Sequence, residues 1–168
     1  MRDELERQYV EYFQPRLPQL HRLAVMLCGD ADRADDIVQA AVTTLYTRWR
    51  HVRDVDNLDA YVRRSVVNAF LSERRRFWSR VLLTEAMPDR AAAAGQPADE
   101  RMVIRAALRA LPPKQQAVLV LRFLCDLPVD EVAELLGCSP GTVKSQTSDG
   151  LAKLRKKLGA LAPAGGGA

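Results

Sequence analysis

Residues 129–158 indicate a helix-turn-helix, a motif that can present side chains to a groove of DNA. Gly137 suits a left-handed turn residue between two helices, and Ser139 followed by Pro140 is a strong signal for the start of the second helix. The polar side chains on this second segment are Ser139, Thr142, Lys144, Ser145, Gln146, Ser148 and Lys153. Lys can bond guanine, Gln can bond adenine, and hydroxyls can bond bases or phosphate. The motif predicts DNA binding, although two packed helices joined by a glycine turn would show the same pattern.

Two earlier stretches present polar residues of opposite charge at helical spacing. In the first, Asp35, Gln39 and Thr43 recur every four residues, and Asp36 lies beside them. In the second, the residues at the same spacing are Arg64, Asn68, Ser72 and Arg76. Arginine is suited to phosphate, whereas amides can bond unstacked bases. The segregation predicts separate surfaces for a protein partner and a polyanion, although either cluster alone can be a solvated helix face.

Helices must position these side chains, because apolar residues recur at three-and-four spacing. Gly29 is a natural helix stop, and Asp30 or Asp32 can cap the helix that follows. The apolar stripe of that helix comprises Ala34, Ile37, Val38, Ala41, Leu45 and Trp49. After a polar break at residues 51–56, Asn57 can cap the next helix. The buried stripe expected there comprises Leu58, Val62, Ser65, Val66 and Ala69.

Composition favours an all-α protein. The chain of 168 residues is 48% hydrophobic but only 6% aromatic, and runs typical of strands are nearly absent. No apolar run approaches the roughly 20 residues of a membrane span. The N-terminus is charged from its second residue and lacks the apolar core of a signal peptide. We therefore expect a cytoplasmic protein without a membrane partner.

Enzymatic and metal chemistry are not expected. Cys28, Cys125 and Cys138 are widely spaced and contain no C-x-x-C pair, so they are interpreted as small core residues. His21 and His51 each lack a second ligand at metal spacing. Neither a catalytic triad order nor a phosphate-binding glycine loop is present. We expect no cofactor, no metal and no catalytic residue.

The helical pattern fades between two halves of the chain. Residues 81–97 contain Pro88, a run of four alanines, Gly95 and Pro97, which favours a mobile linker. The sequence thus predicts two small helical domains, at residues 1–80 and 98–160, followed by a disordered tail at residues 161–168.

Both halves resemble conserved regions of extracytoplasmic-function sigma factors. The segment LPPKQQAVLVLRFLCDLPVDEVAELLGCSPGTVKSQTSDGLAKLRKKL is similar to their region 4. The segments GDADRADDIVQAAVTTLYTRW and NLDAYVRRSVVNAFLSERRR are similar to their region 2. The order is that of the family, with no region 3, and the similarity is greatest to the compact group common in actinobacteria. The resemblance implies an alternative sigma factor that directs RNA polymerase to promoters.

The resemblance also implies roles for particular residues. Asp35, Asp36 and Gln39 lie in the part of region 2 that binds the coiled coil of the β′ clamp in core RNA polymerase. The residues implied in binding the −10 element, as a flipped base or along the backbone, are Asn57, Tyr61, Arg64, Asn68, Arg74, Arg75 and Arg76. The helix containing Lys144 and Ser145 would read the −35 element. The β flap of the polymerase is a further implied partner, and an anti-sigma factor is the regulator that the resemblance implies.

Two positions depart from the family pattern. Asp149 stands where a basic residue is frequent, and Gly150 follows it inside the expected second helix of the motif. An acid there can accept a bond from cytosine, hold a neighbouring base, or weaken a phosphate contact. Ala40 replaces an acid that often follows Gln39. We still expect one continuous helix, because the apolar stripe continues through Leu151, Leu154 and Leu158.

Two other classes of function compete with this interpretation. A stand-alone helix-turn-helix regulator would dimerise and bind duplex DNA by itself, whereas a sigma factor needs polymerase. A degenerate sigma factor acting as a decoy would bind partners without supporting transcription.

Overall fold

The computed structural model describes residues 1–84 and 100–161, and within these ranges the chain is helical and contains no strand. The first half comprises α1 (Arg2–Phe13), the 3₁₀ turn η1 (Gln14–Arg16), α2 (Leu17–Cys28), α3 (Ala31–Val52) and α4 (Leu58–Thr84). The second half comprises α5 (Glu100–Arg109), α6 (Pro113–Leu119), the π-helical turn η3 (Val120–Leu124), α7 (Val129–Leu136) and α8 (Pro140–Leu161). The all-α prediction is confirmed.

Local capping signals begin and end these helices as expected. Gly29 ends α2 in the left-handed conformation, with φ of 74°. The Asp30 side chain then accepts hydrogen bonds from the backbone N–H groups of Asp32 and Arg33, at 2.8 and 3.1 Å. Asn57 caps α4 in the same way, because its Oδ1 accepts from the N–H of Ala60 at 3.1 Å. The predicted break after α3 begins slightly later than expected, since α3 continues to Val52.

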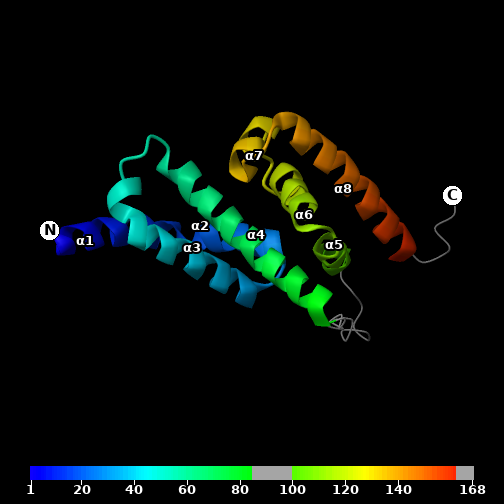
Figure 1. The fold of residues 1–168 in the computed structure, drawn as a ribbon, viewed down its shortest axis with the longest axis horizontal. Helices are drawn as coiled ribbons and strands as arrows, with labels where there is room; N and C mark the ends of the chain where they lie inside the picture. Colours follow the sequence, from blue (N-terminus) through cyan, green and yellow to red (C-terminus); the bar gives the residue numbers. More distant parts are fainter. Residues whose placement is uncertain (85–99, 162–168) are drawn as a thin grey trace.

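The first half is a bundle of α2, α3 and α4, with α1 extending from one end (Figure 1). Every residue of the predicted α3 stripe is buried. An aromatic cluster joins α1 to the end of α3, with the rings of Phe13 and Trp49 5.8 Å apart and Tyr9 and Tyr12 around them. This packing fixes α3, so its opposite face stays in solvent.

The second half contains the predicted helix-turn-helix. Gly137, with φ of 65°, ends α7 in the left-handed conformation, and the Ser139 hydroxyl accepts from the N–H of Thr142 at 3.1 Å at the start of α8. Val143 is fully buried. Helix α8 is continuous through Gly150, as expected. The packing explains why a glycine stands at this position. A β-carbon at Gly150 would lie 3.2 Å from Cδ1 of Leu119, so glycine lets α8 approach α6 closely.

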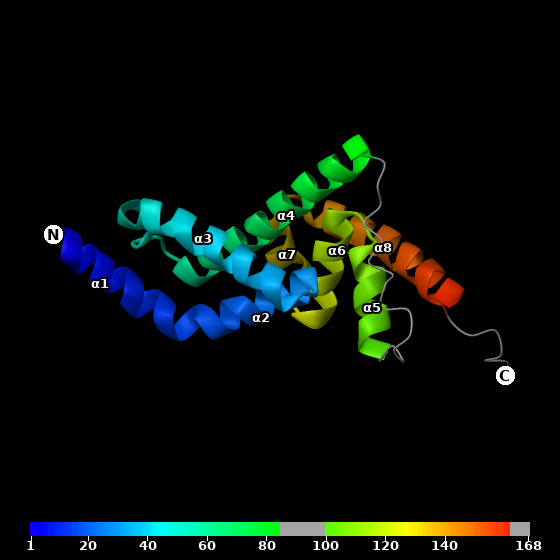
Figure 2. The ribbon, with the colours of Figure 1, turned by 90° about the horizontal axis from the view of Figure 1, so that it is seen from below.

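Helix α4 is shared by both halves. It packs against α2 and α3 on one side and against α6 and α7 on the other, as Figures 1 and 2 show together. The predicted stripe of α4 was therefore partly wrong. Val62 and Val66 are buried, but so are Val67, Phe70 and Leu71, whereas Leu58, Ser65 and Ala69 are only half-buried. A helix covered on two sides buries a wider arc than a single stripe.

Most of the predicted linker and tail lies outside the described residues. Helix α4 continues to Thr84, so the first four residues of the predicted linker, 81–84, are helical. The remainder of the predicted linker, residues 85–97, lies outside the described residues, as does the tail from residue 162. No helix in the described part of the chain is long and apolar enough to cross a membrane.

Candidate nucleic-acid interface

A groove of about 410 Å³ runs between α3 and α4, and it gathers several of the predicted −10 residues. The polar residues that line it are Thr44, Arg48, Tyr61, Arg64, Ser65, Asn68, Ser72 and Arg76. Tyr61, Arg64, Asn68 and Arg76 were predicted from the sequence, whereas Thr44 and Arg48 of α3 were not. The sequence nevertheless contains a pattern that could have identified them. Ala40, Thr44 and Arg48 recur every four residues and therefore lie on one face of α3.

The groove is basic and its side chains are available. Arg48, Arg64 and Arg76 have no ion pair with another residue in the described ranges, and all three are exposed. Asn68 is exposed between them. A row of guanidinium groups around one amide can bind a phosphate backbone while bonding a base edge. The groove is therefore suited to a single strand of nucleic acid.

Three other predicted −10 residues lie outside the groove. The side chain of Asn57 is exposed and its oxygen caps α4. Arg75 is exposed, and its Nε donates to the carbonyl of Leu71 at 3.4 Å. Arg74 is only 4% exposed, because it points into the seam between the two halves of the molecule. Its Nη2 donates to the carbonyl oxygens of Arg109 and Leu111, at 2.7 and 3.2 Å.

The burial of Arg74 was not expected from the arginine run. The sequence did contain a signal, since Arg74 follows Phe70 by four residues and Leu71 by three, and both are buried. Burial lowers the pKa of the Arg74 guanidinium, and the neighbouring Arg33 adds to this effect. In this arrangement Arg74 faces the second half of the chain and not solvent.

The predicted protein-binding residues lie together on the solvent face of α3. Asp35, Asp36 and Gln39 are all exposed. Asp35 Oδ1 lies 2.9 Å from Nε2 of His21, whereas Asp36 and Gln39 have no hydrogen bond or ion pair in the described part of the chain. Ala40 follows them and borders the groove. The acidic face of α3 thus lies beside the basic groove that α3 forms with α4.

The start of α8 leaves most of the predicted −35 residues in solvent. Ser139, Thr142, Lys144, Ser145, Ser148 and Lys153 are exposed, and Gln146 is half-buried. The hydroxyls of Ser139 and Thr142 lie 2.9 Å apart, and Ser145 donates to the carbonyl of Thr142 at 3.2 Å. Lys144 makes no such bond within the described residues, so its ammonium group is available to a ligand. Asp149 is also exposed.

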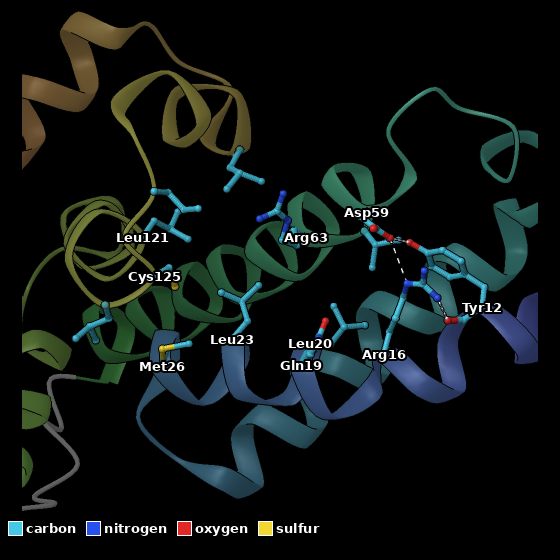
Figure 3. Close-up of a pocket in the computed structure, with 14 residues that line it drawn as sticks. Tyr12, Arg16, Gln19, Leu20, Leu23, Met26, Asp59, Arg63, Leu121 and Cys125 are labelled. Carbon is cyan, nitrogen blue, oxygen red and sulfur yellow. Dashed lines mark hydrogen bonds and ion pairs between the residues drawn. The ribbon is translucent and has the colours of Figure 1, made fainter.

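A second cavity, of about 520 Å³, lies between α2, α4 and the η3–α7 segment (Figure 3). Its middle is apolar, with Leu23 and Leu121 on opposite sides. At one end the Tyr12 hydroxyl donates to the carboxylate of Asp59, which also accepts from Nε of Arg16 at 3.2 Å. The Tyr12 bond holds the pKa of Asp59 below its usual value, whereas burial raises the pKa of Tyr12. This cluster ties α1 and η1 to the start of α4.

No metal site is evident in residues 1–84 and 100–161, where no group of three or more His, Cys, Asp or Glu side chains converges. Cys28 is buried, Cys125 and Cys138 are half-buried, and all three are free thiols.

Comparison with known proteins assigns both halves to characterised families. Residues 12–80 match the family model of Sigma-70 region 2, and residues 101–154 match that of Sigma-70, region 4. The RNA polymerase sigma-E factor of Streptomyces coelicolor is 36% identical over 157 residues, covering 90% of this chain and 86% of that protein. The ECF RNA polymerase sigma factor EcfG of Rhodopseudomonas palustris is 31% identical, covering 86% of this chain and 80% of that protein.

A solved structure shares the fold. The sigma factor RpoE from Bartonella quintana, in co-crystals with the anti-sigma factor NepR, superposes with a TM-score of 0.64. That alignment covers 89% of this chain and 98% of the other, at 22% identity.

Two helical units of these kinds, carried in this order, define a transcription initiation factor of the sigma type. The chain belongs to the sigma-70 family, as an alternative sigma factor of the extracytoplasmic-function type. It directs transcription initiation in partnership with core RNA polymerase and promoter DNA. A stand-alone regulator is the less favoured interpretation.

Proposed function

We propose that the groove between α3 and α4 holds the unpaired −10 strand of a promoter. The observation that supports this most strongly is the convergence of Tyr61, Arg64, Asn68 and Arg76 on one groove. Asn68 bonds the edge of an unstacked base and Tyr61 offers a stacking surface, while the arginines bind phosphates. Arg48 extends the basic wall onto α3. Arg75, further along α4, contacts the phosphate backbone of the same strand.

Region 4, in the second half of the chain, is proposed to read the −35 element. The exposed start of α8 has the geometry with which a recognition helix enters the major groove. Lys144 is the side chain best placed to bond guanine, with Ser145 and Gln146 beside it. Ser139, Thr142, Ser148 and Lys153 are assigned to phosphate or base contacts along the same helix.

The polymerase is proposed to bind two surfaces of the chain. The exposed acidic face of α3, formed by Asp35, Asp36 and Gln39, binds the coiled coil of the β′ clamp. Region 4 binds the β flap and thereby reaches the −35 element at the correct distance. The chain supplies recognition and no catalysis of its own, since the polymerase carries out the chemistry of RNA synthesis.

We further propose that the functional units are residues 1–80 and 98–160, joined by the intervening linker. We also propose that an anti-sigma factor regulates this chain, because a sigma factor of the same fold was crystallised in complex with one. The apolar cavity between α2, α4 and η3 offers a surface for a regulator of this kind.

Gel shifts with and without core polymerase test the proposed function. Promoter DNA should be retarded specifically by the chain together with core polymerase, and weakly or without sequence preference by the chain alone. The double substitution Asp36→Arg and Gln39→Arg should abolish the polymerase-dependent shift while leaving helicity unchanged. Specific retardation of duplex DNA by the chain alone, as a dimer, would instead establish the stand-alone regulator.

A further inference from the structure

The cavity between α2, α4 and the η3–α7 segment contains a positive charge that no residue described in the structure neutralises. Arg63 of α4 lines this cavity and is half-buried. Its guanidinium makes no hydrogen bond or ion pair with another residue of the described ranges. Figure 3 shows it between the apolar middle of the cavity and the Asp59 end. A cation beside apolar walls has lost part of its water, and a bound anion would compensate for that loss.

The carboxylate of the cavity is already engaged by other groups. Asp59 accepts from the Tyr12 hydroxyl and from Nε of Arg16 at 3.2 Å. Arg16 also donates to the carbonyl of Tyr12 at 2.8 Å and lies over the ring of that tyrosine. Two guanidinium groups, Arg16 and Arg63, therefore accompany one carboxylate in the lining, which leaves one unit of positive charge on Arg63.

The rest of the lining is mainly apolar and comes from both halves of the chain. Leu23 of α2 and Leu121 of η3 lie on opposite sides of its middle (Figure 3). The other apolar residues of the lining are Leu20, Met26, Val62, Leu124, Leu127 and Leu135. The volume of about 520 Å³ lies within the range of roughly 300–1,000 Å³ that is usual for small-molecule sites. The cavity thus combines hydrocarbon walls with one uncompensated cation.

We propose that this cavity binds a fatty acid, with the carboxylate on Arg63 and the acyl chain between α2 and the η3–α7 segment. A single uncompensated guanidinium suits a monoanion, and its planar fork can bond both oxygens of a carboxylate. A protein helix fits the interior less well, because a helix about 10 Å across fills about 420 Å³ in each turn. The inference goes beyond the proposed promoter and polymerase contacts, since no residue assigned to those contacts lines the cavity.

Isothermal titration calorimetry on the full-length protein without polymerase tests the proposal. The probes are decanoate, octanoate and the uncharged decanol, each below the concentration at which it forms micelles or separates. Decanoate should bind with a stoichiometry of one. Octanoate should bind at least about fivefold more weakly, because each buried methylene strengthens binding about fourfold. Decanol should bind at least about tenfold more weakly than decanoate, because it lacks the bond between two charged groups.

Substitution of Arg63 separates the charge from the apolar walls. Arg63→Met removes the charge but keeps an unbranched side chain, so decanoate affinity should fall at least about tenfold while decanol affinity changes less than about twofold. Arg22→Met is the matched control, since Arg22 is exposed on α2 outside the cavity, and it should change neither affinity. Leu127→Phe enlarges a half-buried residue of the lining and should weaken both ligands.

Two native thiols locate the bound ligand. Cys125 lines the cavity and Cys138 does not, and both are half-buried and free. Burial raises the pKa of the Cys125 thiol, so alkylation by iodoacetamide is followed at alkaline pH. Decanoate at ten times its dissociation constant should slow the alkylation of Cys125 about tenfold by mass action. Alkylation of Cys138 should keep its rate.

Three results would each overturn the fatty-acid proposal: no binding of decanoate, equal affinity of decanoate for the wild type and Arg63→Met, or equal protection of Cys125 and Cys138. An affinity independent of chain length would also overturn it, because it would indicate an anion on the surface of the protein. If a purified anti-sigma factor protects Cys125 and decanoate does not, the cavity belongs to the protein regulator proposed above and not to a fatty acid.

Discussion

At the scale of single residues, Arg48 is the position where the structure adds most to the interpretation of the sequence. It lies on α3, where the resemblance implied no DNA-binding residue, yet it lines the groove together with Asn68. The sequence pattern assigned α3 to the polymerase and α4 to DNA. Because the two helices pack side by side, one groove draws on both.

Arg48→Ala should therefore weaken binding of the holoenzyme to the single-stranded −10 element. Loss of one phosphate contact should make the slope of log affinity against log salt shallower by about 0.7. Arg50→Ala is the matched control, since Arg50 is exposed on the same helix but lies outside the groove. Equal slopes for the wild type and Arg48→Ala would remove this residue from the site.

Asp149 is the second residue with a distinct prediction. It is exposed on α8 and brings negative charge toward a polyanion. We expect it to weaken a phosphate contact, with Lys153 one turn away as the alternative partner of the backbone. Asp149→Arg should tighten binding to −35 duplexes of every sequence and steepen the salt slope by roughly 0.9. A changed base preference with an unchanged slope for Asp149→Arg would mean that the acid reads sequence.

Lys144→Ala, in contrast, should weaken binding to the cognate −35 site by about 1–3 kcal/mol and relax its sequence preference.

At the scale of elements, helix boundaries were the most predictable feature. Asp30, Asn57 and Ser139 cap helices through bonds within their own first turn, so local sequence suffices to find them. The burial of Phe70 and Arg74 was missed, because periodicity shows which face of a helix is covered but not by how many neighbours. The sequence predicted the α4 residues of the groove. It did not predict the α3 residues, because only the packing of α3 against α4 brings them to the same groove.

The close approach of α8 and α6 makes Gly150 a sensitive position. Gly150→Val should lower the free energy of unfolding by about 1–3 kcal/mol, because the added side chain meets Leu119, which is 3% exposed and cannot move freely. Gly159→Val provides the comparison on the same helix, since a β-carbon there meets nothing within 4 Å. Thermal unfolding followed by circular dichroism measures both. Valine has a higher helix propensity than glycine, so Gly159→Val should not destabilise the protein, and equal effects of the two substitutions would exclude crowding against α6.

The contact between η1 and α4 predicts a dependence of stability on acid. The pKa of Asp59 is lowered in the folded protein, chiefly by its bond from Tyr12, so its contribution is present at neutral pH and is lost as the pH falls below about 4. Asp59→Asn should lower the free energy of unfolding by up to about 1 kcal/mol near pH 7, since the carboxylate is largely exposed. The difference should shrink as the pH falls below about 4. A deficit of Asp59→Asn that stays constant as the pH falls would exclude the ionic contribution.

At the scale of the whole molecule, the two halves share a continuous buried core along α4. The sequence indicated two helical units but contained no local signal for their contact, because that contact joins residues far apart in the chain. The Nε2 of Gln116, for example, donates to the carbonyl of Leu27 at 2.7 Å. A protein that must read two promoter elements needs these units at a separation set by the DNA.

The central claim is that region 2 and region 4 read separate promoter elements for the polymerase. Transcription in vitro from genomic DNA with purified core polymerase, followed by sequencing of RNA 5′ ends, measures this most directly. The wild type should produce a discrete set of start sites preceded by two shared elements. Asn68→Ala should reduce transcription and alter preference only in the −10 element, and Lys144→Ala should relax preference only in the −35 element. Start sites identical to those of core polymerase alone, or substitutions that each change the opposite element, would contradict the account.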